Sequence, residues 1–294
     1  MNTKYLLLTS FLLTGILSTD ALGAPTEAPP LPVIPDATFD IAHYGAMGDG
    51  KTMDTAAIQK AIDAASAAGG GIVQVPAGKF LTRPFTLASR INLHLDPGAV
   101  ILISDDMAHY PVAAGRYQDS IIVSDGQDIE ISGDGAIDGQ GAVWWAAFRS
   151  SPTMTHRPYL IKISNCTRVL VTGVTLRNSP MFHLVPQNCT DVTIRNLHIQ
   201  APAKSPNTDG IDPSGWNFLI TGCAIDTGDD DIAIKPTAVR TPGNKNYLIQ
   251  DCTFGHGHGC SIGSGTVGGI EDVTVNNCTF DQTDSGIRIK SGRD

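Results

Sequence analysis

Four short polar clusters in the C-terminal part of the chain combine carboxylates, an imidazole and two cations. In chain order they are Asn207-Thr208-Asp209-Gly210, Gly228-Asp229-Asp230-Asp231, Gly257-His258-Gly259 and Arg288-Ile289-Lys290. Cleavage of a glycosidic bond needs a carboxylic acid that donates a proton and a carboxylate that activates water or attacks the sugar. Crowded carboxylates can supply both states, because like charges at short range raise the pKa of at least one of them.

The apolar residues around these clusters follow a repeat. Its middle positions are 23 to 29 residues apart. A unit of this length, built from short strands and turns, is the signature of a solenoid, and strand-rich units favour a parallel β-helix with one coil per repeat. Five segments share the pattern of three apolar positions: Val171/Val174/Leu176, Ile194/Leu197/Ile199, Ile220/Cys223/Ile225, Ile249/Cys252/Phe254 and Val275/Cys278/Phe280.

A second apolar column predicts that the polar clusters lie in one row. The residue two positions before each member of this column belongs to the row: Asp209 before Ile211, Asp230 before Ile232, His258 before Cys260 and Ser285 before Ile287. Stacked parallel strands lie about 4.8 Å apart, so these residues should be neighbours along the solenoid. Strand alternation turns Ile287 and Ile289 inward and Arg288 and Lys290 outward, so acids and cations should share one outer face.

The four clusters, in this order and spacing, resemble the polygalacturonase family of pectin-degrading glycoside hydrolases, also called glycoside hydrolase family 28. The hallmarks of that family are Asn-Thr-Asp, Gly/Gln-Asp-Asp, Gly-His-Gly and Arg-Ile-Lys. The resemblance implies an all-β fold, a right-handed parallel β-helix. It also implies hydrolysis, with inversion, of the α-1,4 bonds between galacturonic acid residues of pectic polysaccharide, with no metal and no other cofactor.

The resemblance assigns the catalytic roles residue by residue. Asp229 is similar to the general acid, and Asp209 and Asp230 are similar to the pair that positions and activates water. His258 would tune the protonation of the acid and hold the network together.

The same resemblance assigns the substrate-binding residues. Arg288 and Lys290 would bind the carboxylate of the galacturonate at the cleavage point. The planar guanidinium of Arg288 and the compact ammonium of Lys290 would both donate to this one anion. Asp212, three residues beyond Asp209, matches a position that contacts substrate in many members. Asn207 opens the first motif and is expected at the same site.

Two other functions remain open on the same architecture. A pectate lyase would use calcium held by aspartates and an arginine as base, and the run from Asp229 to Asp231 could bind calcium. His258 beside the acids and the pair Arg288 and Lys290 fit hydrolysis better. A non-catalytic β-helical carbohydrate-binding protein would tolerate loss of Asp209 or Asp229. Endo or exo action, and relatives that act on rhamnogalacturonan or xylogalacturonan, are not distinguished by the sequence.

The N-terminal segment predicts export. Lys4 precedes an apolar run from Tyr5 to Leu17, and small residues favour cleavage before Ala24, so we expect a signal peptide over 1–23 and a secreted protein, extracellular or periplasmic. The run is short for a membrane span. A Pro-rich linker is predicted over 24–37.

The remaining residues, 38–294, are predicted to form the β-helix domain. Members of the family normally continue through further coils, which include a tyrosine that helps to bind sugar. We therefore expect the C-terminal coils to be missing.

One helix is predicted, from Asp54 to Ala68, with Asp54 as N-cap and three glycines after its end. Solenoids need closed ends, so we expect it to cap the N-terminal end. The glycine-rich segment from His43 to Gly50 lacks the lysine of a phosphate loop and is expected to form a turn. Trp144 and Trp145 could stack on sugar or be structural.

The six cysteines are expected to be buried thiols for the most part. Three of them occupy one position of the repeat, which favours small apolar packing. Cys166 and Cys189, one coil apart, are the one pair for which a disulfide is considered.

The formal charge of −9 at pH 7 argues against a nucleic-acid partner, which would need a basic face. The negative net charge also disfavours binding of a polyanionic substrate, so such binding would depend on local positive charge at the site. Lys235, Arg288, Lys290 and His258 are the groups that could offset the carboxylates. We expect a monomer that binds neither nucleic acid nor membrane.

Overall fold

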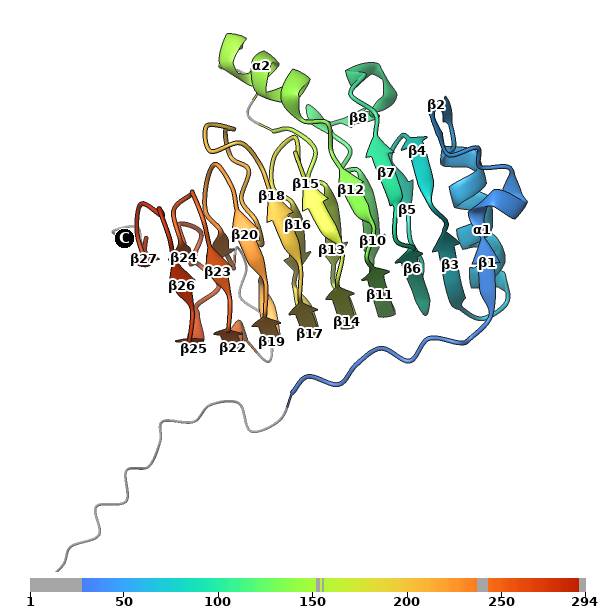
Figure 1. Cartoon of the computed structure of the whole chain (residues 1–294). Coiled ribbons are helices and arrows are strands. Elements are labelled where there is room, and N and C mark those ends of the chain that lie inside the picture. Colours follow the sequence, from blue (N-terminus) through green and yellow to red (C-terminus); the bar gives the residue numbers. More distant parts are fainter. Residues whose placement is uncertain (1–27, 152–153, 155, 237–242, 291–294) are drawn as a thin grey trace, which may run out of the picture.

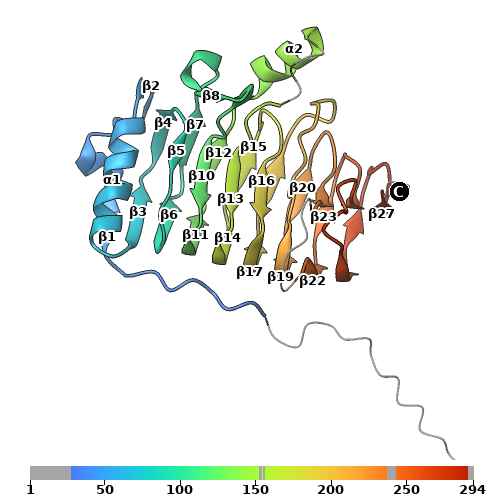
Figure 2. The same ribbon diagram turned by 180° about the vertical axis from the view of Figure 1, so that it is seen from behind.

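The chain forms a parallel β-helix in a computed structural model that describes residues 28–151, 154, 156–236 and 243–290. Apart from one short antiparallel hairpin, the strands pair in parallel with strands of the neighbouring coils, so the coils stack from one end of the molecule to the other (Figures 1 and 2). The coils wind in the right-handed sense that parallel connections favour. The expected all-β solenoid is confirmed. The predicted signal peptide, 1–23, lies outside the described residues, as does the linker before residue 28.

Three parallel sheets run along the solenoid. The first contains β1 (Thr38–Asp40), β3 (Gly71–Val75), β6 (Ile91–Leu95), β11 (Gln127–Gly133), β14 (Thr167–Thr172), β17 (Cys189–Arg195), β19 (Gly215–Thr221), β22 (Lys245–Gln250) and β25 (Glu271–Asn276). The second contains β2 (Asp49–Met53), β4 (Gly78–Thr82), β7 (Ala99–Ile103), β12 (Ala136–Asp138), β15 (Thr175–Arg177), β18 (His198–Gln200), β20 (Ala224–Asp226), β23 (Thr253–Phe254) and β26 (Thr279–Phe280).

The third sheet has two parts. One contains β5 (Phe85–Thr86), β10 (Ile121–Ser124), β13 (Ile161–Ser164) and β16 (Leu184–Gln187), and the other contains β21 (Ile232–Ile234), β24 (Cys260–Ile262) and β27 (Ile287–Ile289). Ile211 joins them by pairing with Leu184 and with Ile232. The other elements are η1 (Ile41–Tyr44), α1 (Thr55–Ala67), η2 (Met107–His109), the antiparallel pair β8 (Val112–Ala113) and β9 (Arg116–Tyr117), and α2 (Ala142–Ser150).

The strand register confirms the apolar repeat. Its first positions pair in succession: Val171, Ile194, Ile220, Ile249 and Val275. Its third positions do the same: Leu176, Ile199, Ile225, Phe254 and Phe280. Because the same face of each strand points inward, these ladders form the continuous core of the solenoid.

Helix α1 covers the N-terminal end of the stack, as expected (Figure 1). Its N-cap is Asp54, but the Asp54 side chain makes no capping bond to the helix. The buried carboxylate instead accepts hydrogen bonds from the backbone N–H groups of Met47, at 2.7 Å, and Gly48, at 3.2 Å. Asp54 therefore ties the glycine-rich turn to the helix, and those N–H groups are occupied by the protein itself.

The tryptophan pair is structural. Trp144 is fully buried and meets the rings of Tyr110 and Tyr117 edge to face. Trp145 is also buried, and its indole Nε1 donates to the carbonyl of Ser179 at 3.0 Å. Neither ring is available to stack on a sugar, and the pair anchors α2 to the upper edge of the coils (Figure 1).

All six cysteines are thiols, and five of them are buried. Cys223, Cys252 and Cys278 occupy corresponding turns of successive coils, where each thiol donates to backbone carbonyls. The disulfide considered for Cys166 and Cys189 is not formed, and each thiol donates to a backbone carbonyl, Cys166 to that of Ser164 and Cys189 to that of Gln187. The prediction of buried thiols is confirmed.

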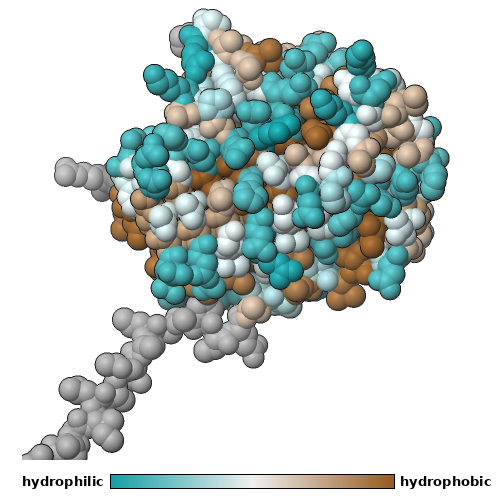
Figure 3. Space-filling view, viewed as in Figure 1, coloured by the Kyte–Doolittle hydropathy of each residue, from teal (hydrophilic) through white to brown (hydrophobic). Residues whose placement is uncertain are grey.

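Apolar side chains also reach the surface at several places on the face shown in Figure 3. Ile287 and Ile289 continue the inward column but are 56% and 74% exposed, because no described coil packs over them. In the part of the chain that the structure describes, no helix is long and apolar enough to cross a membrane.

Candidate active site

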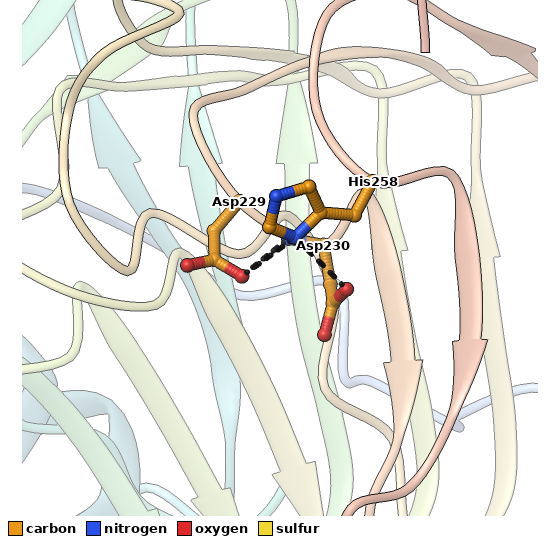
Figure 4. A group of neighbouring side chains, drawn as sticks. All are labelled: Asp229, Asp230 and His258. Carbon is orange, nitrogen blue, oxygen red and sulfur yellow. Dashed lines mark hydrogen bonds and ion pairs between the residues drawn. The ribbon is translucent and has the colours of Figure 1, made fainter. Parts of the chain in front are cut away.

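The turns before the third sheet place the reactive residues side by side. The inward column pairs in the expected order, Ile211 with Ile232, Ile232 with Cys260 and Cys260 with Ile287. The imidazole of His258 consequently faces two carboxyl groups from the preceding coil (Figure 4). His258 Nδ1 lies 3.3 Å from Asp229 Oδ1 and 3.5 Å from Asp230 Oδ1.

Asp230 is held by three donors. Arg288 Nη2 and Ser261 Oγ donate to its Oδ1 at 2.5 and 2.7 Å, and Lys290 Nζ donates to Oδ2 at 2.7 Å. Burial opposes ionisation, but the hydrogen bonds from Lys290 and Ser261 and the charges of Lys235 and Lys290 outweigh it and lower the pKa of Asp230. Asp230 is therefore an ionised carboxylate.

This pairing modifies the expectation for the two cations. Arg288 and Lys290 are both bound to Asp230, a partner that the sequence did not assign to them. Their side chains are still 30% and 29% exposed. Both cations could therefore also bind a carboxylate that arrives from solvent while they remain in contact with Asp230.

Asp209 lies one coil before Asp230 and shares a cation with Asp212. Lys235 Nζ donates to both carboxyl groups, at 3.0 Å to Asp212, and lies 3.9 Å from Asp230. Burial and the neighbouring Asp212 raise the pKa of Asp209, and burial raises that of Asp212 to about 6.

Asp229 is positioned by Asn207, which the sequence placed at the site, and Asn207 is in turn held by Arg157, which the sequence did not single out. Asn207 Nδ2 donates to Asp229 Oδ2 at 3.3 Å, and the Oδ1 of Asn207 accepts from Arg157 Nη2 at 3.0 Å. Arg157 is buried, and its guanidinium also donates to the carbonyls of Pro180 and Pro206 at 2.9 Å. Since Arg157 has only donors, it fixes which end of the Asn207 amide faces Asp229.

The protonation of His258 follows from its partners. Arg288 Nη2 lies 3.0 Å from His258 Nδ1 and can only donate, so Nδ1 accepts and the ring proton is on Nε2. Nε2 faces Asp284 Oδ2 at 3.4 Å. The accepting Nδ1 also faces Asp229 Oδ1, so His258 lies next to the carboxyl group that resembles the general acid.

Asp231 points away from this cluster. Its Oδ1 accepts from Thr227 Oγ1 at 3.2 Å and its Oδ2 from the backbone N–H of Gly259 at 3.1 Å, and the residue is fully buried. Burial raises the pKa of Asp231 to about 8. The aspartate run therefore does not converge on one point, which argues against the calcium site considered for it.

Asp231 should make the stability depend on pH. The folded state keeps a proton that the unfolded state releases above its usual pKa of 3.8, so stability falls as pH rises from about 4 to about 8. The slope is at most about 1.4 kcal/mol per pH unit. Asp231→Asn should flatten this part of the profile and be at least as stable as the wild type at pH 9. Urea unfolding at pH 5, 7 and 9 measures this. The control is Asp226→Asn, an exposed aspartate on the same coil, and parallel wild-type and Asp231→Asn profiles would contradict the prediction.

Asp229, Asp230 and His258 are also the one described group whose ligand atoms could converge on a metal ion, within 4.8 Å of one another. The donor set does not suit a cation, because both oxygens of Asp230 already accept from Arg288, Lys290 or Ser261. A metal here would compete with two fixed positive charges.

His183 lies behind the row and is structural. The residue is fully buried, its Nδ1 lies 3.0 Å from the Asp209 carbonyl, and its Nε2 accepts from the N–H of Ser179 at 3.3 Å. Burial lowers the pKa of His183 to about 4, so the ring is neutral and supports the turn that carries Asp209.

Comparison with known proteins identifies the family. The model of "Glycosyl hydrolases family 28" matches residues 68–294. The chain belongs to this family. The family 28 resemblance of the four motifs is thereby confirmed.

Known family 28 relatives and solved structures agree. A probable polygalacturonase of Vitis vinifera is 37% identical over 278 residues, which cover 86% of this chain and 56% of that protein. The chain spans about half the length of the curated relatives that it matches.

Two solved structures share the fold. The exopolygalacturonase of Thermotoga maritima superposes with a TM-score of 0.79 at 30% identity, covering 90% of this chain and 71% of that one. The polygalacturonase of Erwinia carotovora superposes with a TM-score of 0.77 at 30% identity, covering 90% of this chain and 74% of that one.

Proposed function

We propose that the chain carries the catalytic apparatus for hydrolysis of α-1,4 bonds between galacturonic acid residues of pectin. The observation that carries this proposal is the excess of acids over cations in one cluster. Four carboxyl groups, Asp209, Asp212, Asp229 and Asp230, meet three cations, Lys235, Arg288 and Lys290. Like charges at this range disfavour ionisation of every carboxyl group at once, so such a cluster can supply an acid beside ionised carboxylates.

The roles follow from the contacts of each group. Asp229 is the general acid, since it is the one of these four carboxyl groups that contacts His258 and has no Lys or Arg ion pair among the described residues. Asp230 is the base, because its donors keep it ionised. Asp209 positions the water with Asp230, and the two are linked through Lys235.

The spacing of the carboxyl groups bears on the stereochemistry. Oxygens of Asp229 and Asp230 lie within 4.8 Å, which is shorter than the usual 6.5 to 9.5 Å of inverting pairs. The nucleophilic water therefore cannot lie between these two groups. We place it against Asp209 and Asp230, on the side of the sugar away from Asp229, which preserves inversion.

Arg288 and Lys290 bind the carboxylate of the galacturonate at the cleavage point. They are partly exposed and lie against Asp230, so a substrate carboxylate held there brings the scissile bond next to the acid. These two cations also answer the objection raised by the net charge of −9.

The test is incubation of the whole chain with polygalacturonate, with reducing ends and products measured over time. Hydrolysis gives saturated oligomers, and its rate should be unaffected by a chelator. Unsaturated products, detected by their ultraviolet absorbance, would favour a lyase instead. Loss of activity with a chelator would also favour a lyase. Proton NMR of the first products distinguishes inversion, which gives a β reducing end, from retention, which gives α.

We also propose that the protein is exported through its residues 1–23 and acts as a monomer on pectic polysaccharide outside the cytoplasm. The apolar run after Lys4 is the support for export. Detection of a mature chain that starts at Ala24 would establish it.

A further inference from the structure

Arg157 is a buried arginine that donates hydrogen bonds to three oxygens. Nε donates to the carbonyl of Pro180 and Nη2 to that of Pro206, both at 2.9 Å, and Nη2 also donates to Asn207 Oδ1 at 3.0 Å. Pro180 and Pro206 lie in the turns that follow β15 and β18, which are paired strands of successive coils. Arg157 therefore joins two successive turns and reaches the reactive row through Asn207.

Helix α2 holds the guanidinium of Arg157 from another side. Arg157 Cζ lies 4.1 Å from the centroid of the Phe148 ring, which belongs to α2. The helix is itself fixed to the coils by the indole bond of Trp145 and by Arg149, whose Nη2 donates to the carbonyl of Lys204 at 2.7 Å. A guanidinium that stacks on a ring and donates along its edge has a defined orientation.

Asn207 passes this orientation on to the acid. Its backbone is left-handed, with φ 53°, a conformation that asparagine tolerates better than most residues. Because Arg157 can only donate, Asn207 Oδ1 is committed to it, and Nδ2 is the atom that meets Asp229 Oδ2, at 3.3 Å. An amide turned the other way would place two acceptors against each other. Arg157 thus decides that Asp229 meets a donor.

Arg157 keeps its positive charge at neutral pH. Burial lowers its pKa to about 10, and the negative charge of Asp229 opposes this shift. Asp229 becomes a carboxylate when it gives its proton to the leaving oxygen, so the Asn207 N–H and the Arg157 charge both act on the group where negative charge develops. Arg157 is 1% exposed, so it acts on the acid and not on the substrate.

We propose that Arg157 is a positioning residue of the general acid: by holding Asn207, it fixes the place and direction from which Asp229 protonates the leaving oxygen. The proposal rests on the proposed function. In that reaction the proton of Asp229 passes to the glycosidic oxygen as its bond to the anomeric carbon breaks, and Asp230 takes a proton from the water that attacks this carbon. Arg157 exchanges no proton.

A purely structural role of Arg157 is the alternative, because two of its three hydrogen bonds go to backbone carbonyls. The two roles differ in the substrates that they affect. The leaving oxygen of polygalacturonate needs a proton from the acid, whereas α-galacturonosyl fluoride releases fluoride, which needs little help from an acid. A misplaced acid therefore slows hydrolysis of the polymer selectively, and a distorted site slows hydrolysis of both substrates.

The test is the kinetics of Arg157→Lys on both substrates, with reducing ends and released fluoride as the measured products. Lysine keeps the charge, but its compact ammonium cannot reproduce a fork that spans three oxygens. On polygalacturonate, kcat should fall roughly 10- to 100-fold, the usual cost of a misplaced reacting group. KM for the polymer and kcat for the fluoride should both stay within about 3-fold of the wild type, since only an interaction of the transition state is lost.

The matched control is Arg168→Lys. Arg168 donates from Nε and Nη2 to Asp128, both at 2.7 Å, on the first sheet and away from the reactive row. This substitution also breaks a fork between two fixed partners, so it reports what the loss of a structural arginine does. Both substrates should be hydrolysed at the wild-type rate.

Asn207→Gly is a second variant that leaves Arg157 in place. Glycine adopts φ 53° without strain, so only the amide is removed. Asn207→Gly should show the same selective loss on polygalacturonate. The double variant of Arg157→Lys and Asn207→Gly should be no slower than the slower single variant, because the two residues act in series.

Three results would overturn the role of Arg157: a wild-type rate of Arg157→Lys on polygalacturonate, an equal loss on both substrates in Arg157→Lys or Asn207→Gly, or additive losses in the double variant. In each of them the wild type still hydrolyses polygalacturonate, so the proposed function stands. A wild-type chain that hydrolyses neither substrate contradicts the proposed function itself, and the role of Arg157 with it.

Discussion

Replacing Asp229 by asparagine is expected to lower the rate of polygalacturonate hydrolysis by roughly 10²- to 10⁴-fold, the usual contribution of a general acid. Asparagine cannot donate a proton to the leaving oxygen, and it leaves His258 Nδ1 without an acidic partner. The fold should be retained, since the Asp229 side chain is 23% exposed and its Oδ1 contact with the N–H of Asp230 can be made by an amide oxygen. Initial rates of reducing-end release measure the effect.

The matched control is Asp226→Asn. Asp226 lies three residues earlier on the same coil and forms a similar pair with His256, at 3.1 Å, but its side chain is 54% exposed. The loss of this exposed pair should leave the hydrolysis rate close to that of the wild type. If Asp229→Asn keeps more than about a tenth of the wild-type rate, a general-acid contribution of roughly 10²-fold or more is absent and the assignment of Asp229 is wrong.

Replacing Lys235 by methionine is expected to destabilise the chain by about 3–5 kcal/mol at pH 7, the typical effect of breaking a buried ion pair. Asp209 and Asp212 are nearly inaccessible, with side chains 2% and 4% exposed, and Lys235 is the cation that both contact. Without it, a buried negative charge is left uncompensated. Methionine retains most of the apolar stem, so packing against Phe182 is largely preserved.

The loss of stability caused by Lys235→Met should become smaller as the pH is lowered. Both carboxyl groups already have raised pKa values, and that of Asp212 is about 6. Their contribution to the free energy of unfolding is therefore largest at low pH and is lost as the pH rises. In Lys235→Met they should protonate at still higher pH, and at pH 4 the variant should approach the wild type. Urea unfolding at pH 4 and pH 7 tests this.

Two further variants control the Lys235 prediction. Lys79→Met removes an exposed lysine and should change stability by less than about 0.5 kcal/mol. Adding Asp209→Asn and Asp212→Asn to Lys235→Met removes the uncompensated charge and should restore part of the stability at pH 7. A Lys235→Met chain as stable as Lys79→Met would show that the cation does not compensate these carboxylates.

The row of reactive residues could be predicted because the fold is periodic. Once Ile211, Ile232, Cys260 and Ile287 are recognised as one column, parallel register places the residues before them on neighbouring coils. Counting along the repeat is therefore enough to identify residues that are far apart in the chain but are neighbours in the structure. The family motifs then supplied the chemistry that the counting could not.

The partners of each side chain could not be predicted in this way. Asp229, Asp230 and Asp231 are consecutive, yet one faces His258, one is bound by Arg288 and Lys290, and one turns inward. They lie in a turn between strands, where no regular alternation fixes the direction of a side chain. Arg157 was missed for a related reason, because it reaches Asn207 from 50 residues away through an irregular segment.

The sequence alone determined the coil length, the inward columns, the capping helix and the row of acids. These follow from a short-range pattern, in which each apolar position must be buried against the corresponding position one coil away. Only the tertiary structure decided the charge pairing: which carboxylates share Lys235, and that Arg288 and Lys290 hold Asp230. Long charged side chains can reach several coils, so their partners depend on burial and distance in the folded protein, and no sequence spacing specifies these.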